Sequence, residues 1–473
     1  CADRSIGIGS EPAGKASGME NHYDQSALAV PLVTKKSPGR RLQVTAVWEE
    51  SKKLWDVVGP AVFMRLALYG LNIVSQVFVG HLGDRQLAAF SIASTVIDGL
   101  NFGFILGMAG SLDTLCGQAY GAKQYAMMGV HLQRSWLVLL AFAVLLAPTY
   151  VFSGPLLAAA GLSADLARDA GLASMYLVPS LFMYAVMLPA TTFLQCQLKN
   201  WVTGVAAAAV FPVHVAATWL LVQRLGLGIL GAAMAFNLSW FVYAVLQLAY
   251  ALGGGCPETW AGFSAAAFRF ADMMEFLKLS ASSGVMVCLE NWYYRLLIFL
   301  TGYMKNAEVA VDALSICMSL SGLEMMIHLG FLVGTGVRVA NELGAGNGKG
   351  ARFAMFVSTT TSFLISLSIS ILTLIFHDKL AMIYTSSEAV IDAVDDISIL
   401  LAITILLNGV QPVLSGVAIG SGWQGLVAYV NIGCYYLIGI PFGILLGWGF
   451  HYGVYVCHSE NTMMTRLIFV WGH

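Results

Sequence analysis

Glu290 is the residue with the clearest chemical potential, because it lies near the middle of a long apolar stretch. The charged form of a carboxyl group is disfavoured in a low-dielectric medium, so Glu290 could take up and release a proton there. Such a group could couple proton flow to the movement of a solute. The structural alternative is a static ion pair with Arg295, five residues further on, or with a group on a neighbouring helix. We favour the coupling role.

Three aromatic residues, Trp292, Tyr293 and Tyr294, share the apolar stretch with Glu290. Flat aromatic walls around a carboxylate suit planar or cationic organic solutes, through stacking and cation–π contacts. Polar side chains inside apolar segments can also serve as contacts between membrane helices. With both readings open, the remaining candidates for a solute path are Asn72, Asn101, Arg295 and Asn408.

Arg65 and Asp98 are further charges inside apolar stretches. Buried charges usually pair, so we expect a mutual structural ion pair between adjacent helices with no role in coupling. Asp113 falls near the end of its segment, and we expect it to contact a gate or a loop.

The composition shows what kind of element must hold these residues. Hydrophobic residues make up 58% of the 473 residues and charged residues only 11%, against roughly 45–50% and about 25% in soluble domains. A net charge of −2 offers no basic stripe for nucleic acid. The sequence has no phosphate-binding loop for ATP, no zinc spacing and no hydrolase motif, so we expect neither an enzyme nor a cofactor.

Eleven apolar segments follow a polar amino-terminal region, each long enough to cross a bilayer. They span approximately residues 55–79, 86–110, 135–158, 166–193, 201–222, 226–251, 276–302, 308–337, 353–376, 390–419 and 426–450. From Met19 onward, fourteen Lys and Arg residues fall on the side of the amino end and five on the other. This asymmetry predicts a cytosolic amino terminus.

The chain contains an internal repeat with an offset of 223 residues. Gly121-Ala122 closes the second segment and Gly344-Ala345 closes the eighth (344 − 121 = 223). The same offset lays residues 54–83 on 277–306, one apolar segment on another. Six segments separate the copies, so both halves face the same way, which is typical of transporters with a site between parallel repeats.

The second copy is incomplete in its sequence pattern. The counterpart of the sixth segment should begin near Gly453, but no apolar stretch of about 20 residues follows. We therefore predict a polar cytosolic tail (1–53), a first lobe of six helices (54–251), a cytosolic linker (252–275), a second lobe of five helices (276–454) and an aberrant tail (455–473).

Five motifs make the chain resemble the multidrug and toxic compound extrusion (MATE) family, in particular the plant detoxification proteins. They are SQVFVGHLG at 75–83, LCGQAYGA at 115–122, CLENWY at 288–293, RVANELGAG at 338–346 and QPVLSGVA at 411–418. The resemblance covers about residues 48–454. It implies an all-α integral membrane protein with twelve helices in two lobes, the last helix missing here, around a V-shaped cavity.

The resemblance also implies proton-driven export of organic cations or plant secondary metabolites, with Glu290 as the coupling carboxylate. Other members carry a second glutamate at the position of Arg295, some carry an aspartate at Asn408, and bacterial relatives carry an aspartate at Ser75. Coupling in this chain would therefore depend on Glu290 alone.

The favoured hypothesis is a monomeric antiporter of small organic solutes and protons in the tonoplast or plasma membrane. A truncated isoform that does not transport is the alternative, because the twelfth helix is missing from the pattern. A lipid-linked substrate flippase would need a cationic cavity, for which Arg65 and Arg295 are too few.

Overall fold

The computed structural model describes residues 40–301, 307–385 and 387–441. Within these ranges it describes all side chains except those of 40–44, 270–271, 291–312, 314–315 and 396. Residues 1–46 form one unit and residues 47–473 a second, compact unit. The second unit contains every contact discussed below.

The described part of the chain is built from helices. This is expected of a chain in lipid, where each backbone polar group must be satisfied within its own segment. The first repeat contains α1 (Arg40–Gly80), α2 (Asp84–Ser91), the π-helical segment η2 (Ile92–Asp98), α3 (Gly99–Gly121), α4 (Tyr125–Val151), α5 (Ser153–Ala159), α6 (Ala164–Tyr176), α7 (Val178–Cys196), α8 (Asn200–Thr218), η3 (Trp219–Arg224), α9 (Gly228–Tyr250) and η4 (Ala251–Gly255).

The second repeat follows a short linker. It contains η5 (Ala265–Phe268), α10 (Phe270–Thr301), α11 (Ala307–Gly344), α12 (Gly348–Met382), α13 (Glu388–Asn408), α14 (Gln411–Ser421), α15 (Gln424–Asn431) and η6 (Ile432–Gly439). Gly346 and Gly422, with φ of 72° and 79°, end α11 and α14 in the left-handed region that favours glycine.

Nine helices in the described ranges are long and apolar enough to cross a membrane. All eleven predicted segments are mainly helical where the structure describes them, including 276–302 in α10 and 426–450 in α15 and η6; 135–158, 166–193 and 390–419 are each divided into two helices by a short break. The predicted loss of a twelfth helix and the tail 455–473 lie outside the described residues. Large apolar side chains such as Phe356, Leu364 and Ile375 remain exposed along α12, as expected of a face that meets lipid.

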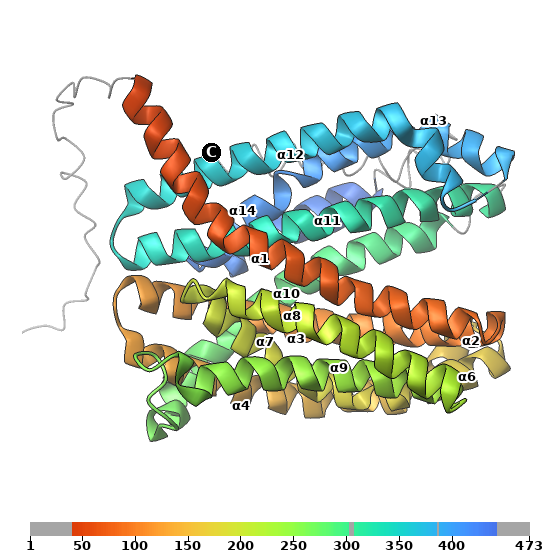
Figure 1. Cartoon of the computed structure of the whole chain (residues 1–473), viewed down its shortest axis with the longest axis horizontal. Helices are drawn as coiled ribbons and strands as arrows, with labels where there is room; N and C mark the ends of the chain where they lie inside the picture. Colours follow the sequence, from red (N-terminus) through yellow and green to blue (C-terminus); the bar gives the residue numbers. More distant parts are fainter. Residues whose placement is uncertain (1–39, 302–306, 386, 442–473) are drawn as a thin grey trace, which may run out of the picture. The chain divides into compact units, whose positions relative to one another are not determined.

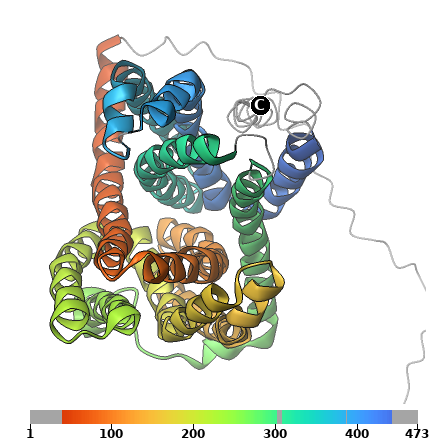
Figure 2. The same cartoon turned by 90° about the vertical axis from the view of Figure 1, so that its right-hand side faces the viewer.

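The two repeats form two groups of helices within the second unit (Figure 1). The main core joins α3, α4, α6, α7, α8 and α9, and a second core joins α11, α12 and α13. Figure 2 shows the same two groups from the side. Two helices cross between them. α1 packs Leu54 and Val58 against Phe331 of α11, and α10 hydrogen-bonds to α3 through Ser280 and Ser111 (Oγ–Oγ 2.7 Å).

The helix α1 begins earlier than the sequence pattern suggests. Residues 40–53 of the predicted polar tail are helical, and Glu50 is buried. Glu50 is buried because it forms an ion pair across the repeats. The Arg338 guanidinium donates to Glu50 Oε1 through Nε (2.9 Å) and through Nη2 (2.8 Å). Arg338 also donates to Glu342 Oε1 at 2.7 Å. A charge that looks like part of a solvated tail is thus held at an interface between helices.

The linker is tied to the first repeat. Arg134 of α4 forms an ion pair with Asp272 (Nη2–Oδ2 2.6 Å), and Gln133 donates to the Gly262 carbonyl at 3.0 Å. Lys199 donates to the Gly255 carbonyl at 2.6 Å. These bonds fix the path of the chain between the two copies.

Candidate transport site

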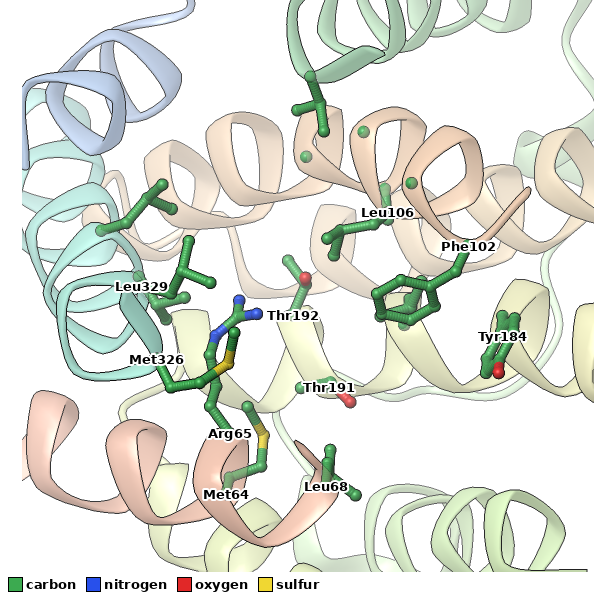
Figure 3. A pocket seen from close by; sticks show the side chains of 18 of the residues that line it. Met64, Arg65, Leu68, Phe102, Leu106, Tyr184, Thr191, Thr192, Met326 and Leu329 are labelled. Atoms are coloured by element: carbon green, nitrogen blue, oxygen red, sulfur yellow. The ribbon is translucent and has the colours of Figure 1, made fainter. Parts of the chain in front are cut away.

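A cavity of about 520 Å³ lies between the two repeats. Its walls come from α1, η2, α3, α7 and α9 of the first repeat and from α10, α11 and α14 of the second. Most lining side chains are apolar, and the few polar ones come from separate helices, as is usual for sites that bind small organic molecules. Figure 3 shows Met64, Leu68, Leu106, Met326 and Leu329 around this space.

An aromatic wall covers the first-repeat side of the cavity. Phe102 and Tyr184 meet edge to face with ring centroids 4.9 Å apart, and Tyr184 meets Trp240 at 5.0 Å. Phe236 extends the wall, 5.9 Å from Trp240. All four residues line the cavity. The sequence pattern placed the aromatic wall at Trp292, Tyr293 and Tyr294 instead, whose side chains lie outside the described part of α10.

Asp98 lies behind this wall and lines the cavity. Its carboxylate accepts three hydroxyl hydrogen bonds: from Tyr150 (2.8 Å) and Ser180 (2.9 Å) at Oδ1, and from Tyr184 (2.9 Å) at Oδ2. Charge-assisted bonds of this kind allow a buried carboxylate to keep its charge. The π-helical turn η2 ends at Asp98, and such turns are frequent at functional sites.

The expected ion pair between Arg65 and Asp98 is not formed. Asp98 is satisfied by the three hydroxyls, and the carboxylate that interacts electrostatically with Arg65 is Asp113. Both Arg65 and Asp113 line the cavity, so Asp113 borders the site; its expected contact with a gate or a loop stays a prediction. Figure 3 shows Arg65 pointing into the cavity between Met326 and Thr192. Its Nε atom has no hydrogen-bond partner among the described groups.

Glu290 lines the cavity from the second-repeat side. Its Oε1 atom accepts a short hydrogen bond from the side-chain amide of Gln411, the first residue of α14. Gln411 also lies 3.3 Å from the Ser415 hydroxyl. Glu290 thus borders the cavity and contacts the start of α14. A two-residue turn, Gly409 and Val410, separates α14 from α13. The side chain of Arg295 lies outside the described part, so an ion pair with Glu290 stays a prediction.

The other predicted path residues are divided between wall and framework. Asn72 lines the cavity and accepts from Gln76 at 2.9 Å. Asn101 is buried and donates to the Ile97 carbonyl at 2.8 Å, so it holds the helix together away from the cavity wall. Asn408 is also absent from the lining residues and lies 3.4 Å from both Ser321 and Glu324.

Glu324 is a buried carboxyl group that our sequence reasoning missed. It forms an ion-pair contact with His328, one turn further along α11 (Oε1–Nε2 2.6 Å). The signal was present as a Glu and a His four residues apart in an apolar segment, a spacing that places both on one helix face.

The repeats close against each other at the ends of α3 and α11. A Cβ atom on Gly121 would collide with the backbone of Asn341, and one on Gly344 would collide with the backbone of Gln118. These contacts are related by the repeat, because 344 − 121 and 341 − 118 both equal 223. Gln118 also donates to the Gly420 carbonyl at 3.2 Å. We call this contact, formed by Gly121, Gln118, Asn341 and Gly344, the closed end.

Comparison with known proteins agrees with the repeat. A family model described as MatE matches the chain twice, at residues 60–220 and 283–445. The two matches begin 223 residues apart (283 − 60), which is the offset found in the sequence.

The relatives are plant proteins. Protein DETOXIFICATION 27 of Arabidopsis thaliana is 53% identical over 437 residues, which cover 92% of this chain and 89% of that protein. Protein DETOXIFICATION 26 of the same plant is 52% identical over 86% of this chain and 83% of that protein.

Solved structures agree with the fold. The crystal structure of the eukaryotic MATE transporter AtDTX14 superposes with a TM-score of 0.83 at 32% identity, covering 90% of this chain and 96% of that one. A Vibrio cholerae MATE transporter, VcmN, matches in fold with a TM-score of 0.81 at 17% identity. The chain therefore belongs to the MATE family and is a multi-pass membrane transporter of the plant DETOXIFICATION type.

Proposed function

We propose that the protein exports planar organic cations or plant secondary metabolites in exchange for protons. The observation that carries this proposal is the position of Glu290, a carboxyl group that borders the cavity and bonds to Gln411 at the start of α14. Protonation would remove the charge that accepts this bond, so proton binding and the placement of α14 are linked. The proton gradient then supplies the driving force, and the cycle uses neither ATP nor a cofactor.

The cavity walls support the substrate class. The wall of Phe102, Tyr184, Trp240 and Phe236 offers flat faces for a planar solute. Asp98 places a negative charge behind the wall. The hydroxyl of Tyr184, a residue of the wall, donates a hydrogen bond to the Asp98 carboxylate. A planar cation would therefore find stacking and electrostatic attraction from the same side of the cavity. Arg65 also lines the cavity and would repel a cation from its own part of the space.

Alternating access would require the closed end to open. We propose that the closed end faces the cytosol, in line with the excess of Lys and Arg on the side of the amino terminus, and that the structure represents the outward-facing state. The cavity lies between the two repeats of the same chain, and we propose a working monomer. The tonoplast and the plasma membrane are both suitable locations for such an exporter.

The test is uptake of ethidium, a planar organic cation, into proteoliposomes with an acidic interior. We expect the wild type to accumulate ethidium, and Glu290→Gln to lower the initial rate at least about tenfold, since the variant removes the titrating group while keeping its shape. Glu275→Gln is the matched control, because Glu275 lies exposed on the same helix. Equal rates for the wild type and Glu290→Gln would refute coupling through Glu290. A wild type unable to accumulate ethidium would favour the non-transporting alternative.

A further inference from the structure

A second carboxyl group lies buried in the second repeat, away from the cavity wall. Glu324 is 5% exposed and His328 is fully buried. Besides its contact with Glu324, His328 bonds through Nδ1 to the Ser362 hydroxyl (2.9 Å) and lies 2.8 Å from the Ser366 hydroxyl at Nε2. The cluster therefore joins α11 to α12 through four side chains.

The chemistry of this cluster suits a group that changes its protonation state. A buried charge is costly unless it is paired and hydrogen-bonded. With one added proton, the Glu324–His328 pair can exist as a carboxylate beside an imidazolium or as a carboxylic acid beside a neutral ring. Serine hydroxyls can rotate to donate or to accept, so Ser362 and Ser366 can satisfy the imidazole ring in either state.

The cluster is connected to the cavity through a break in the helix. Asn408, the last residue of α13, lies with its side-chain amide 3.4 Å from Glu324 Oε2. Gln411, three residues later, begins α14 and donates to Glu290. Only Gly409 and Val410 separate the two helices, so two amides at one break each contact a carboxyl group, the half-buried Glu290 and the buried Glu324. A rotation of Gln411 when Glu290 is protonated would move the backbone that positions Asn408.

Other charged groups near this cluster are few. The helices around α11 carry the following charged or His residues with described side chains: Arg338 and Glu342 further along α11; Lys349, Arg352, His377, Asp378 and Lys379 toward the two ends of α12; Glu388, Asp392 and Asp395 at the start of α13; Asp98 and Asp113 on the η2–α3 segment; Glu49, Glu50, Lys52, Lys53, Asp56 and Arg65 on α1; and Asp272, Glu275, Lys278 and Glu290 on α10. None of these forms an ion pair with Glu324 or His328 among the described contacts.

We propose that Glu324, positioned by His328, is a second proton-binding carboxyl group of the transport cycle, coupled to Glu290 through the break between α13 and α14. This inference rests on the proposed antiport. One proton would bind at Glu324 and one at Glu290 from the side of higher proton concentration, and both would be released on the other side in exchange for one solute cation.

The test counts protons by thermodynamics. In proteoliposomes clamped at zero membrane potential, the accumulation ratio of ethidium at steady state changes about tenfold per pH unit for each coupled proton, because each pH unit is worth a factor of ten in the equilibrium. We expect the wild type to show a slope of about a hundredfold per pH unit and Glu324→Gln a slope of about tenfold. The rate of ethidium exchange at equal pH on both sides should be the same in Glu324→Gln and the wild type within about twofold, since exchange needs no net proton movement.

A rescue variant separates a proton-binding role from a structural one. Asn408→Asp in the Glu324→Gln background returns a carboxyl group to the other side of the 3.4 Å contact, and we expect it to restore the hundredfold slope. If Glu324→Gln fails to fold, the dependence of ethidium accumulation on the pH gradient is measured in His328→Gln instead. A wild type with no accumulation would refute the antiport itself. Accumulation that follows the same slope in the wild type and Glu324→Gln would overturn only the role of Glu324.

Discussion

The closed end gives a prediction whose size follows from the packing. The substitution Gly121→Ala would place a methyl group well inside 3.0 Å of the Asn341 carbonyl oxygen and against the backbone of Ala345. Backbone atoms cannot rotate away, so α3 and α11 would have to separate by something on the order of 1 Å. Overpacking of this kind costs about 1–3 kcal/mol.

The cost falls only on the conformation in which the two repeats meet. At about 1.4 kcal/mol per factor of ten, Gly121→Ala should lower the population of the closed end roughly 5- to 150-fold relative to the open one. The related Gly344→Ala collides with the backbone of Gln118 and should act in the same direction. Turnover should fall in both variants, because the cycle must return through this state.

The assay is pulsed EPR on spin labels at Lys123 and Lys349, which are exposed residues just beyond the ends of α3 and α11. We expect a short distance in the parent protein and a growing long-distance population in Gly121→Ala and Gly344→Ala. Gly59→Ala is the control, because a Cβ atom there would meet nothing within 4 Å. Unchanged distance distributions and unchanged ethidium turnover in both variants would show that the glycine contact does not set the closed state.

Two further substitutions probe the walls and the frame. Asp98→Asn removes the charge behind the aromatic wall. Because a charged contact is worth about 1.5–3 kcal/mol, KM for ethidium should rise roughly tenfold or more while kcat changes little. A KM equal to that of the parent in steady-state uptake would contradict a cation site here. Arg338→Gln removes the guanidinium that Glu50 and Glu342 share and leaves them with Lys53 and Asn347 as neighbours. Loss of one member of a buried pair costs up to about 3–5 kcal/mol, so Tm in detergent should fall by several degrees. The double variant with Glu50→Gln should recover part of the loss, and a Tm for Arg338→Gln equal to that of the parent would mean that this pair contributes nothing.

The sequence was sufficient for features that depend on local pattern. Hydropathy predicted the helical segments, because a bilayer demands long apolar runs. The 223-residue offset predicted the parallel repeat, and the glycine motifs that revealed it are the residues that meet at the closed end. The same pattern could not show that α1 starts at Arg40, because Glu50 finds its partner 288 residues away in Arg338.

The partners of buried polar groups were the part that the sequence could not supply. Asp98 is held by Tyr150, Ser180 and Tyr184, which lie 52, 82 and 86 residues further along the chain. Periodicity indicates which face of a helix is polar but not which neighbouring helix it meets, so the three hydroxyl partners of Asp98 could not be predicted in place of Arg65. The local spacing of Glu324 and His328 was visible in the sequence, but the contact of Glu324 with Asn408 across the helix break was not.

The most direct test of the central claim is the driving ion of transport. Ethidium accumulation should be measured at steady state in proteoliposomes of the purified protein, once with a pH gradient at equal sodium and once with a sodium gradient at equal pH. We predict accumulation that rises with the pH gradient, does not respond to the sodium gradient, and is lost in Glu290→Gln. Accumulation that follows the sodium gradient, or that persists unchanged in Glu290→Gln, would contradict proton-coupled export through this cavity.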